Sequence, residues 1–222
     1  MKVDAKICGI RSAAARDAAA AGGAAFLGFV FYPRSPRAVT AAEAASLARH
    51  APAGVRTVGV FVDPDDATLA ATLETARLDM VQLHGDETPA RVAAVKARFG
   101  RPVIKAIKVA GERDLAQAEA FRDSADWLMF DARPPRDRAG ALPGGNALVF
   151  DWRLIAGRRW SLPWFLSGGL TAETVGEAVA ATGARHVDVS SGVESAPGEK
   201  DPAKIAAFLD AVRRIQSPTS AQ

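Results

Sequence analysis

Four side chains that can exchange a proton each close a separate apolar segment of the chain. A thiol ends "AKIC", an imidazole ends "VQLH", a carboxyl ends "LMFD" and a hydroxyl ends "VDVS"; these groups belong to Cys8, His84, Asp131 and Ser190. General acid and base catalysis uses such groups when a fold holds them around one substrate. Whether they meet depends on the elements that carry them.

Two glycine-containing stretches, "LSGGL" at 166–170 and "VSSGVE" at 189–194, follow or end apolar segments. Glycine lets backbone N–H groups approach an anion closely, and a helix that begins nearby adds positive potential. We therefore predict a phosphate site built from Gly168, Gly169, Ser190, Ser191 and Gly192. Either stretch alone is equally consistent with an ordinary turn that needs glycine.

A third stretch, "FYPRSPRAVT" at 31–40, places Arg34 and Arg37 near prolines that stiffen it. A rigidly held guanidinium can bind a carboxylate through two parallel hydrogen bonds. The alternative is that both arginines are solvated surface residues.

Short β-branched or aromatic runs alternate with alanine-rich stretches, which is typical of repeated strand and helix units around a parallel sheet. The expected strands are 3–8, 24–31, 56–62, 79–84, 101–108, 126–131, 163–168 and 185–191. The expected helices lie near 12–21, 40–50, 65–76, 87–98, 112–121, 151–156, 171–182 and 201–215, with caps at Ser12, Thr40, Thr171 and Asp201. Eight pairs in 222 residues favour a single-domain α/β fold of the (β/α)8 TIM-barrel class; an open doubly wound sheet is the alternative.

Side chains alternate across a strand, so the apolar positions that face helices identify the positions that face the barrel interior. Val81 and Leu83 face helices, which leaves Gln82 and His84 inside. The same alternation turns further polar residues inward, namely Lys6, Cys8, Asp131, His186, Asp188 and Ser190. The reactive groups then meet at the carboxyl ends of the strands, where barrel enzymes build their sites, and His84 and Asp188 become substrate-binding candidates.

Each candidate also has a structural interpretation. A lone buried cysteine often only fills a core, Asp131 can cap a helix or pair with a following arginine, and His84 can be a hydrogen-bonded structural residue. The three histidines have neither His-x-x-x-His spacing nor clustered carboxylates beside them. We therefore expect no metal site.

Composition narrows the class of protein. A net charge of +3 with dispersed Lys and Arg provides no basic stripe for nucleic acid. The apolar run 18–32 is too short to cross a membrane, one cysteine excludes an internal disulfide, and no leader pattern precedes the first strand. We expect a cytoplasmic monomer whose residues 1–215 form the barrel and whose residues 216–222 form a disordered tail. The Pro-rich, Gly-rich and Arg-rich segment 132–146 is expected to be a functional or disordered loop.

Eight motifs in chain order resemble the phosphoribosylanthranilate isomerase family, (β/α)8 enzymes of tryptophan biosynthesis. They are "KICGI" at 6–10, "FYPRSPR" at 31–37, "VGVFV" at 58–62, "VQLHG" at 81–85, "FDAR" at 130–133, "FDW" at 150–152, "LSGGL" at 166–170 and "VDVSSGVE" at 187–194. The resemblance implies an Amadori rearrangement of N-(5-phosphoribosyl)anthranilate to 1-(2-carboxyphenylamino)-1-deoxyribulose 5-phosphate, without metal or organic cofactor.

The same resemblance implies roles for individual residues. Cys8 is the general base, Asp131 the general acid, and Arg37 the ligand of the anthranilate carboxylate, while the two glycine-containing stretches hold the phosphate. The base must reach its thiolate form, and a free thiol has a pKa of about 8.5. We expect the Lys6 cation or helix N-termini at the barrel mouth to raise the thiolate fraction.

One departure and several rivals bear on this interpretation. The family usually has Gly-Gly-Ser/Thr-Gly before "FDW", whereas this chain has "GGNA" with Asn146 and Ala147, so the detailed role of that loop stays open. The nearest rival is the phosphoribosyl-formimino isomerase of histidine biosynthesis, which has an aspartate in place of Cys8 and two half-barrel repeats that we do not find here. More distant rivals are a phosphosugar barrel that uses a Schiff-base lysine, with Lys105 and Lys108 as candidates, and a non-catalytic phosphate-binding barrel.

Overall fold

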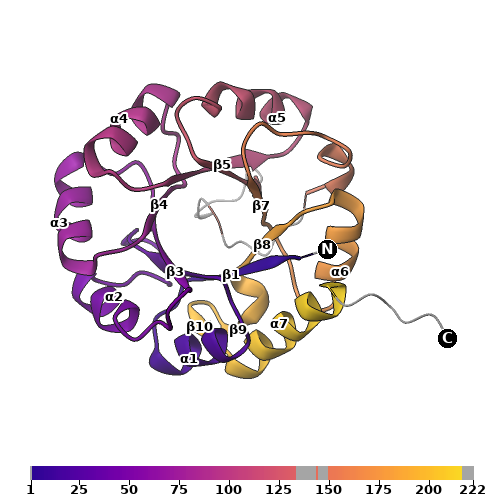
Figure 1. Ribbon diagram of the computed structural model, residues 1–222, viewed down its shortest axis with the longest axis horizontal. Coiled ribbons are helices and arrows are strands. Elements are labelled where there is room, and N and C mark those ends of the chain that lie inside the picture. Colours follow the sequence, from indigo (N-terminus) through magenta and orange to yellow (C-terminus); the bar gives the residue numbers. More distant parts are fainter. Residues whose placement is uncertain (1, 134–143, 145–149, 217–222) are drawn as a thin grey trace.

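Eight parallel strands close into a barrel in chain order, which confirms the predicted fold class against the open sheet. The computed structural model describes residues 2–133, 144 and 150–216, and Figure 1 shows the ring of strands with the helices outside it. The strands are β1 (Asp4–Cys8), β2 (Phe26–Val30), β3 (Arg56–Phe61), β4 (Met80–Leu83), β5 (Val103–Val109), β6 (Trp127–Ala132), β7 (Trp164–Leu166) and β8 (His186–Val189). Each overlaps its predicted range.

Most of the helices follow directly after a residue whose side chain caps their first turn. The helices are α1 (Ala13–Ala21), α2 (Ala41–Ala48), α3 (Asp66–Ala76), α4 (Pro89–Phe99), α5 (Glu112–Ala118), α6 (Val175–Thr182) and α7 (Pro202–Gln216). Predicted caps hold at Ser12, Thr40 and Asp201, whose side chains accept hydrogen bonds from the first helical turn. The predicted cap at Thr171 is wrong, because its N–H donates to Thr174 Oγ1 in a turn that delays the start of α6.

Two further elements differ from expectation. The predicted helix at 151–156 is a single 3-10 turn, η2 (Trp152–Leu154), and the left-handed Gly157 (φ 71°) follows soon after it. So short a segment cannot meet the entropic cost of nucleating an α-helix. After β8, a 3-10 turn η3 (Ser191–Val193) leads into an unpredicted antiparallel hairpin of β9 (Glu194–Ala196) and β10 (Glu199–Lys200). A third 3-10 turn, η1 (Glu119–Phe121), follows α5.

The interior of the barrel is layered. Apolar side chains fill its amino-terminal part, including Phe26, Val58, Met80, Ile104, Met129 and Phe165. The Phe26 and Phe165 rings pack edge to face with their centroids 5.1 Å apart. A separate apolar cluster lies between the strands and the helices and contains Ile7, Val81 and Leu83, as strand alternation predicts. The apolar filling at one end leaves the carboxyl end of the barrel for polar groups.

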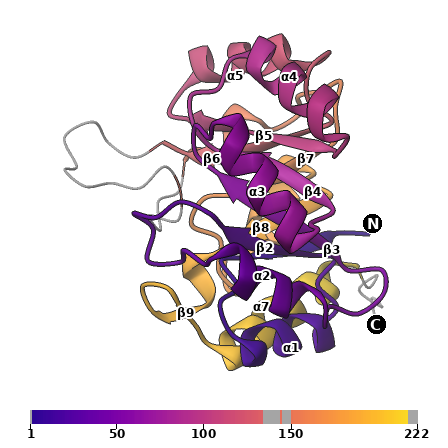
Figure 2. The ribbon, with the colours of Figure 1, turned by 90° about the vertical axis from the view of Figure 1, so that its left-hand side faces the viewer.

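The loops that follow the strands gather at that carboxyl end. In Figure 2, β9 lies on the opposite side of the barrel from the N-terminus. Most of the loop predicted at 132–146, including Asn146, lies outside the described residues, as do Ala147 and the predicted tail apart from Gln216, which ends α7. No helix in the described part of the chain is long and apolar enough to cross a membrane.

Candidate active site

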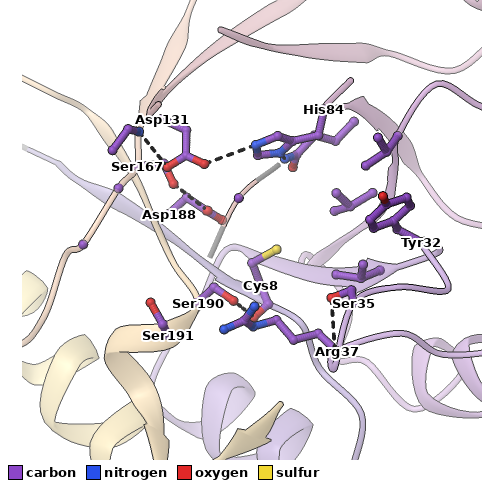
Figure 3. Close-up of a pocket in the computed structure, with 18 of the residues that line it drawn as sticks. Cys8, Tyr32, Ser35, Arg37, His84, Asp131, Ser167, Asp188, Ser190 and Ser191 are labelled. Carbon is purple, nitrogen blue, oxygen red and sulfur yellow. Dashed lines mark hydrogen bonds and ion pairs between the residues drawn. The ribbon is translucent and has the colours of Figure 1, made fainter. Parts of the chain in front are cut away.

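A cavity opens at the carboxyl end of the barrel and brings the four proton-exchanging groups together. Its empty volume is about 770 Å³ when the open mouth is counted. The lining residues are Cys8, Val30, Tyr32, Ser35, Arg37, Val60, Val62, Gln82, His84, Asp131, Ala132, Gly144, Ser167, Gly168, Gly169, Leu170, Asp188, Ser190 and Ser191. Figure 3 shows Cys8, His84 and Asp131 around the same space.

Cys8 ends β1 and lines the cavity. Gly28 lies opposite it on β2, and a Cβ there would sit 3.0 Å from the Cys8 Sγ and 3.1 Å from the Lys6 Nζ, so glycine leaves room for both atoms. Burial raises the pKa of the thiol, and the Lys6 cation lowers it by a smaller amount. Lys6 therefore favours the thiolate, as expected, but burial outweighs it and the pKa of Cys8 is raised overall. Lys6 offsets only part of the effect of burial.

A buried ion pair lies beside Cys8. The fully buried Lys6 Nζ lies 2.7 Å from Asp188 Oδ1, and Asp188 Oδ2 accepts a hydrogen bond from Ser167 Oγ at 3.0 Å. Burial lowers the pKa of Lys6, but Asp188 and Cys8 raise it by more, so Lys6 stays cationic. Asp188 lines the cavity with both carboxylate oxygens held by neighbouring strands or loops.

Asp131 and His84 form a second polar pair in the lining. His84 Nε2 lies 3.1 Å from Asp131 Oδ2, and the Ala132 N–H donates to Asp131 Oδ1 at 3.0 Å. Gly144 lies against this pair, since a Cβ there would be 2.8 Å from His84 Nε2 and 2.9 Å from Asp131 Oδ2. His84 is thus both a hydrogen-bonded residue and part of the cavity wall.

Arg37 lines the cavity while binding a carboxylate of the protein itself. Its Nε and Nη2 donate to the two oxygens of Glu194 at 2.8 Å each, whereas Arg34 is exposed. Lys200 Nζ lies 2.5 Å from Glu194 Oε1 and 3.0 Å from the Ser190 carbonyl oxygen. Burial raises the pKa of Glu194, but Arg37 and Lys200 together lower it by more. Burial also lowers the pKa of Lys200, against the attraction of Glu194.

The loops after β7 and β8 form one side of the cavity. Gly168 and Gly169 adopt positive φ angles of 90° and 65°, which glycine tolerates best, and both line the cavity with Ser190 and Ser191. Gly192 is not among the lining residues in the described part of the chain. A Cβ on Gly192 would lie 2.0 Å from the Leu170 carbonyl oxygen, so this glycine allows the two loops to touch.

Several residues of this site were not singled out from the sequence. Glu194 ends the motif "VDVSSGVE", and strand alternation turns Gln82 toward the barrel interior. Both features could have identified these residues as part of the site. Lys200 lies in β10, outside the barrel, and no sequence pattern identified it. Across residues 2–133, 144 and 150–216, no three His, Cys, Asp or Glu side chains are grouped in a way that could hold a metal ion.

Comparison with known sequences gives a consistent family. A family model described as N-(5'phosphoribosyl)anthranilate (PRA) isomerase matches residues 5–211. The N-(5'-phosphoribosyl)anthranilate isomerase of Rhodospirillum centenum is 58% identical over 209 residues, which cover 94% of this chain and 97% of that protein.

Solved structures show the same similarity. Crystallised monomers generated from the dimeric phosphoribosylanthranilate isomerase of Thermotoga maritima match with a TM-score of 0.82 at 33% identity, covering 96% of this chain and 99% of theirs. A phosphoribosylanthranilate isomerase crystallised with reduced 1-(o-carboxyphenylamino)-1-deoxyribulose 5-phosphate matches with the same TM-score, identity and coverage.

Proposed function

The chain belongs to the N-(5'-phosphoribosyl)anthranilate isomerase family, and from this membership we propose how its cavity performs the family's reaction. The protein is an isomerase of tryptophan biosynthesis that converts N-(5-phosphoribosyl)anthranilate to 1-(2-carboxyphenylamino)-1-deoxyribulose 5-phosphate. We assign Cys8 as the general base and Asp131 as the general acid.

One observation carries this assignment: Cys8 and Asp131 line the same cavity from β1 and β6, which are not neighbouring strands. An Amadori rearrangement needs one group that gives a proton to the furanose ring oxygen and another that removes a proton from C2. Two groups that reach in from separate strands can serve these two atoms of one bound sugar.

The proposed sequence begins with two proton transfers by the assigned residues. Asp131 protonates the ring oxygen, the C1–O bond breaks, and the nitrogen lone pair forms an iminium with C1. The Cys8 thiolate then takes the C2 proton, and the C–H electron pair moves toward C1 and neutralises the iminium nitrogen. The resulting enol amine becomes the 2-ketone when C1 gains a proton and the C2 hydroxyl loses one.

The remaining lining residues bind the two charged ends of the substrate in this scheme. Gly168, Gly169, Ser190 and Ser191 hold the phosphate, with Gly192 fixing the contact between their loops. Arg37 holds the anthranilate carboxylate, while Glu194 and Lys200 fix the plane of its guanidinium. His84 and Asp188 line the space between these ends.

The experiment that tests the function follows the loss of fluorescence of freshly made N-(5-phosphoribosyl)anthranilate. We expect turnover by the wild type and a loss of about a hundredfold to ten-thousandfold in kcat for Cys8→Ala and for Asp131→Asn. The productive form needs a thiolate and a protonated carboxyl, so the pH profile is bell-shaped. Asp131→Asn should lose the fall in activity at high pH, because its residual activity needs only the thiolate, and Cys8→Asp should shift the profile to lower pH, because a carboxyl ionises below a thiol. No turnover by folded wild type contradicts the function, and unchanged limbs contradict the assignment.

We further propose that residues 1–215 act as one catalytic domain and that the protein works as a monomer in the cytoplasm on a phosphorylated small molecule. The closed barrel holds every assigned residue within one unit, which supports the first point. The relative from Thermotoga maritima is described as dimeric, so light scattering of the purified chain is the measurement that decides the second. A dimer mass at micromolar concentration would contradict it.

A further inference from the structure

We propose that Gln82 is a positioning residue for the general acid, acting through His84. Its amide fixes the tautomer of the imidazole, and the imidazole then leaves the acidic proton of Asp131 directed toward the substrate. The inference rests on the proposed role of Asp131 and extends it to a residue without an assigned role.

The orientation of the Gln82 amide follows from its two neighbours. Gln82 is buried on β4, and its Nε2 lies 2.8 Å from His84 Nδ1 and 3.3 Å from Met129 Sδ. A thioether sulfur accepts hydrogen bonds but cannot donate them, so the atom that faces it is the amide nitrogen. Gln82 Oε1 has no hydrogen-bond partner among the described residues. Turning the amide round would instead leave its two N–H groups unpaired and set the oxygen against the sulfur.

This orientation determines the tautomer of His84. An amide nitrogen only donates, so Nδ1 must accept, and the neutral imidazole carries its hydrogen on Nε2. Nε2 then donates to Asp131 Oδ2 at 3.1 Å. Within the described residues, Gln82 and Asp131 are the side-chain hydrogen-bond partners of the imidazole.

The tautomer decides where the proton of Asp131 points. Oδ2 accepts from His84 and Oδ1 from the Ala132 N–H, so a proton bound by the carboxyl occupies one of the remaining lone pairs, away from the imidazole. In the opposite tautomer, Nε2 would accept the Asp131 O–H and hold that proton away from the substrate. Gln82 therefore keeps His84 from competing with the ring oxygen for the acidic proton.

Neighbouring charges hold this arrangement without contacting the imidazole. Lys105 Nζ donates to the Gly85 carbonyl oxygen at 2.8 Å and pairs with Glu87 at 2.6 Å, which fixes the backbone just after His84. Lys6 and Asp188 pair with each other elsewhere in the barrel interior. Asp131 is thus the ring's one ionisable partner among the described residues, and the hydrogen bond from Gln82 determines that Nδ1 accepts.

The test reads the tautomer directly. The full-length chain is labelled with ¹⁵N-histidine, and the His84 signals are identified by their absence in His84→Asn. In the free wild type near neutral pH we expect an unprotonated Nδ1 and a protonated Nε2. Gln82→Met should give a mixture of tautomers, and Gln82→Glu, whose carboxylate only accepts, should give a protonated Nδ1. Gln117→Glu makes the same chemical change on the exposed face of α5 and should leave the signals unchanged.

Kinetics on the same proteins complete the test. We expect kcat to fall about tenfold in Gln82→Met and further in Gln82→Glu, with KM nearly unchanged, which is less than the loss of a general acid itself. A merely structural role would lower stability without moving the ¹⁵N signals or separating kcat from KM.

A protonated Nδ1 in the free wild type overturns the inference, and this outcome does not depend on the Gln82 variants. So does a Gln82→Met protein with wild-type signals and wild-type kcat, because any loss in Gln82→Glu is then an effect of charge. Failure of the proposed function shows differently, as absent turnover by the wild type whatever the tautomer of His84.

Discussion

The reactivity of the single cysteine depends on two opposing effects on one atom. Burial disfavours the thiolate of Cys8, while the cation of Lys6 favours it without fully compensating. Lys6 keeps its charge despite full burial because Asp188 lies 2.7 Å away. Asp188, Lys6 and Cys8 therefore act as one electrostatic unit, and a change in one of them should appear in the ionisation of the thiol.

Replacing Lys6 by Met should raise the pKa of Cys8 further. The substitution removes the cation and leaves the Asp188 carboxylate, which itself disfavours a nearby thiolate. We expect alkylation by iodoacetamide at pH 7 to slow by about tenfold, which corresponds to one pH unit in the midpoint. The measurement is unambiguous because the chain has one cysteine.

The matched control for this prediction is Lys105→Met. Lys105 is also buried inside the barrel, but it pairs with Glu87 rather than with Asp188. Its removal should leave the alkylation midpoint of Cys8 in place. Equal midpoints in Lys6→Met and the wild type would show that the cation does not influence the thiol.

At the scale of elements, the cavity depends on how closely consecutive loops approach. The loop after β8 touches the loop after β7 where Gly192 meets the Leu170 carbonyl oxygen. Because both loops supply proposed phosphate ligands, their spacing sets the geometry of that end of the site.

Gly192→Ala should separate these loops. Its Cβ would lie 2.0 Å from the Leu170 carbonyl oxygen. A backbone atom cannot move aside as easily as the end of a flexible side chain. We expect KM for the phosphorylated substrate to rise while kcat changes less, and the free energy of unfolding to fall by about 1–3 kcal/mol. Steady-state kinetics and urea denaturation measure these effects.

Gly176→Ala provides the contrasting control on α6, where an added Cβ meets no atom within 4 Å. Alanine is favoured over glycine in a helix by up to about 1 kcal/mol, so this variant should not be destabilised and its KM should be unchanged. If both glycine variants behaved alike, close contact between the loops could not be the cause.

Elements with a strong alternating pattern were predictable from the sequence. Val81 and Leu83 face the helices while Gln82 and His84 face the interior. The opposite orientation would place the polar side chains against the apolar helices. The hairpin of β9 and β10 was missed, and the turn η2 was predicted as a longer helix, because both segments are too short to carry a period.

For the whole molecule, barrel closure creates contacts that no local pattern encodes. Arg37 and Glu194 are 157 positions apart, yet they share two hydrogen bonds. The arginine was predicted to bind a carboxylate, but nothing in the sequence pattern showed that the protein supplies one itself. The pKa direction of Cys8 escaped prediction for a similar reason, since it depends on the balance between burial and neighbours from other strands.

Acid should weaken the whole fold. The pKa of Glu194 is lowered because Arg37 and Lys200 outweigh its burial, and burial lowers the pKa of His186. Both groups bind fewer protons in the folded chain than in the unfolded chain, so stability present near pH 7 falls as pH drops, first through the histidine range and then through that of Glu194. Urea denaturation at pH 7, 5.5 and 4 should show a steadily smaller free energy of unfolding.

Glu194→Gln separates the contribution of the buried carboxylate from the rest. The variant leaves Arg37 and Lys200 without their anion, so it should be less stable than the wild type at pH 7 by about 3–5 kcal/mol. The difference should shrink as the pH falls toward 4 and below, because the unfolded wild type then binds a proton that the folded carboxylate does not bind. Glu177→Gln, on an exposed position of α6, should keep the wild-type dependence on pH. If the difference in free energy of unfolding between wild type and Glu194→Gln stayed constant from pH 7 to pH 4, the Glu194 carboxylate would not link folding to protonation.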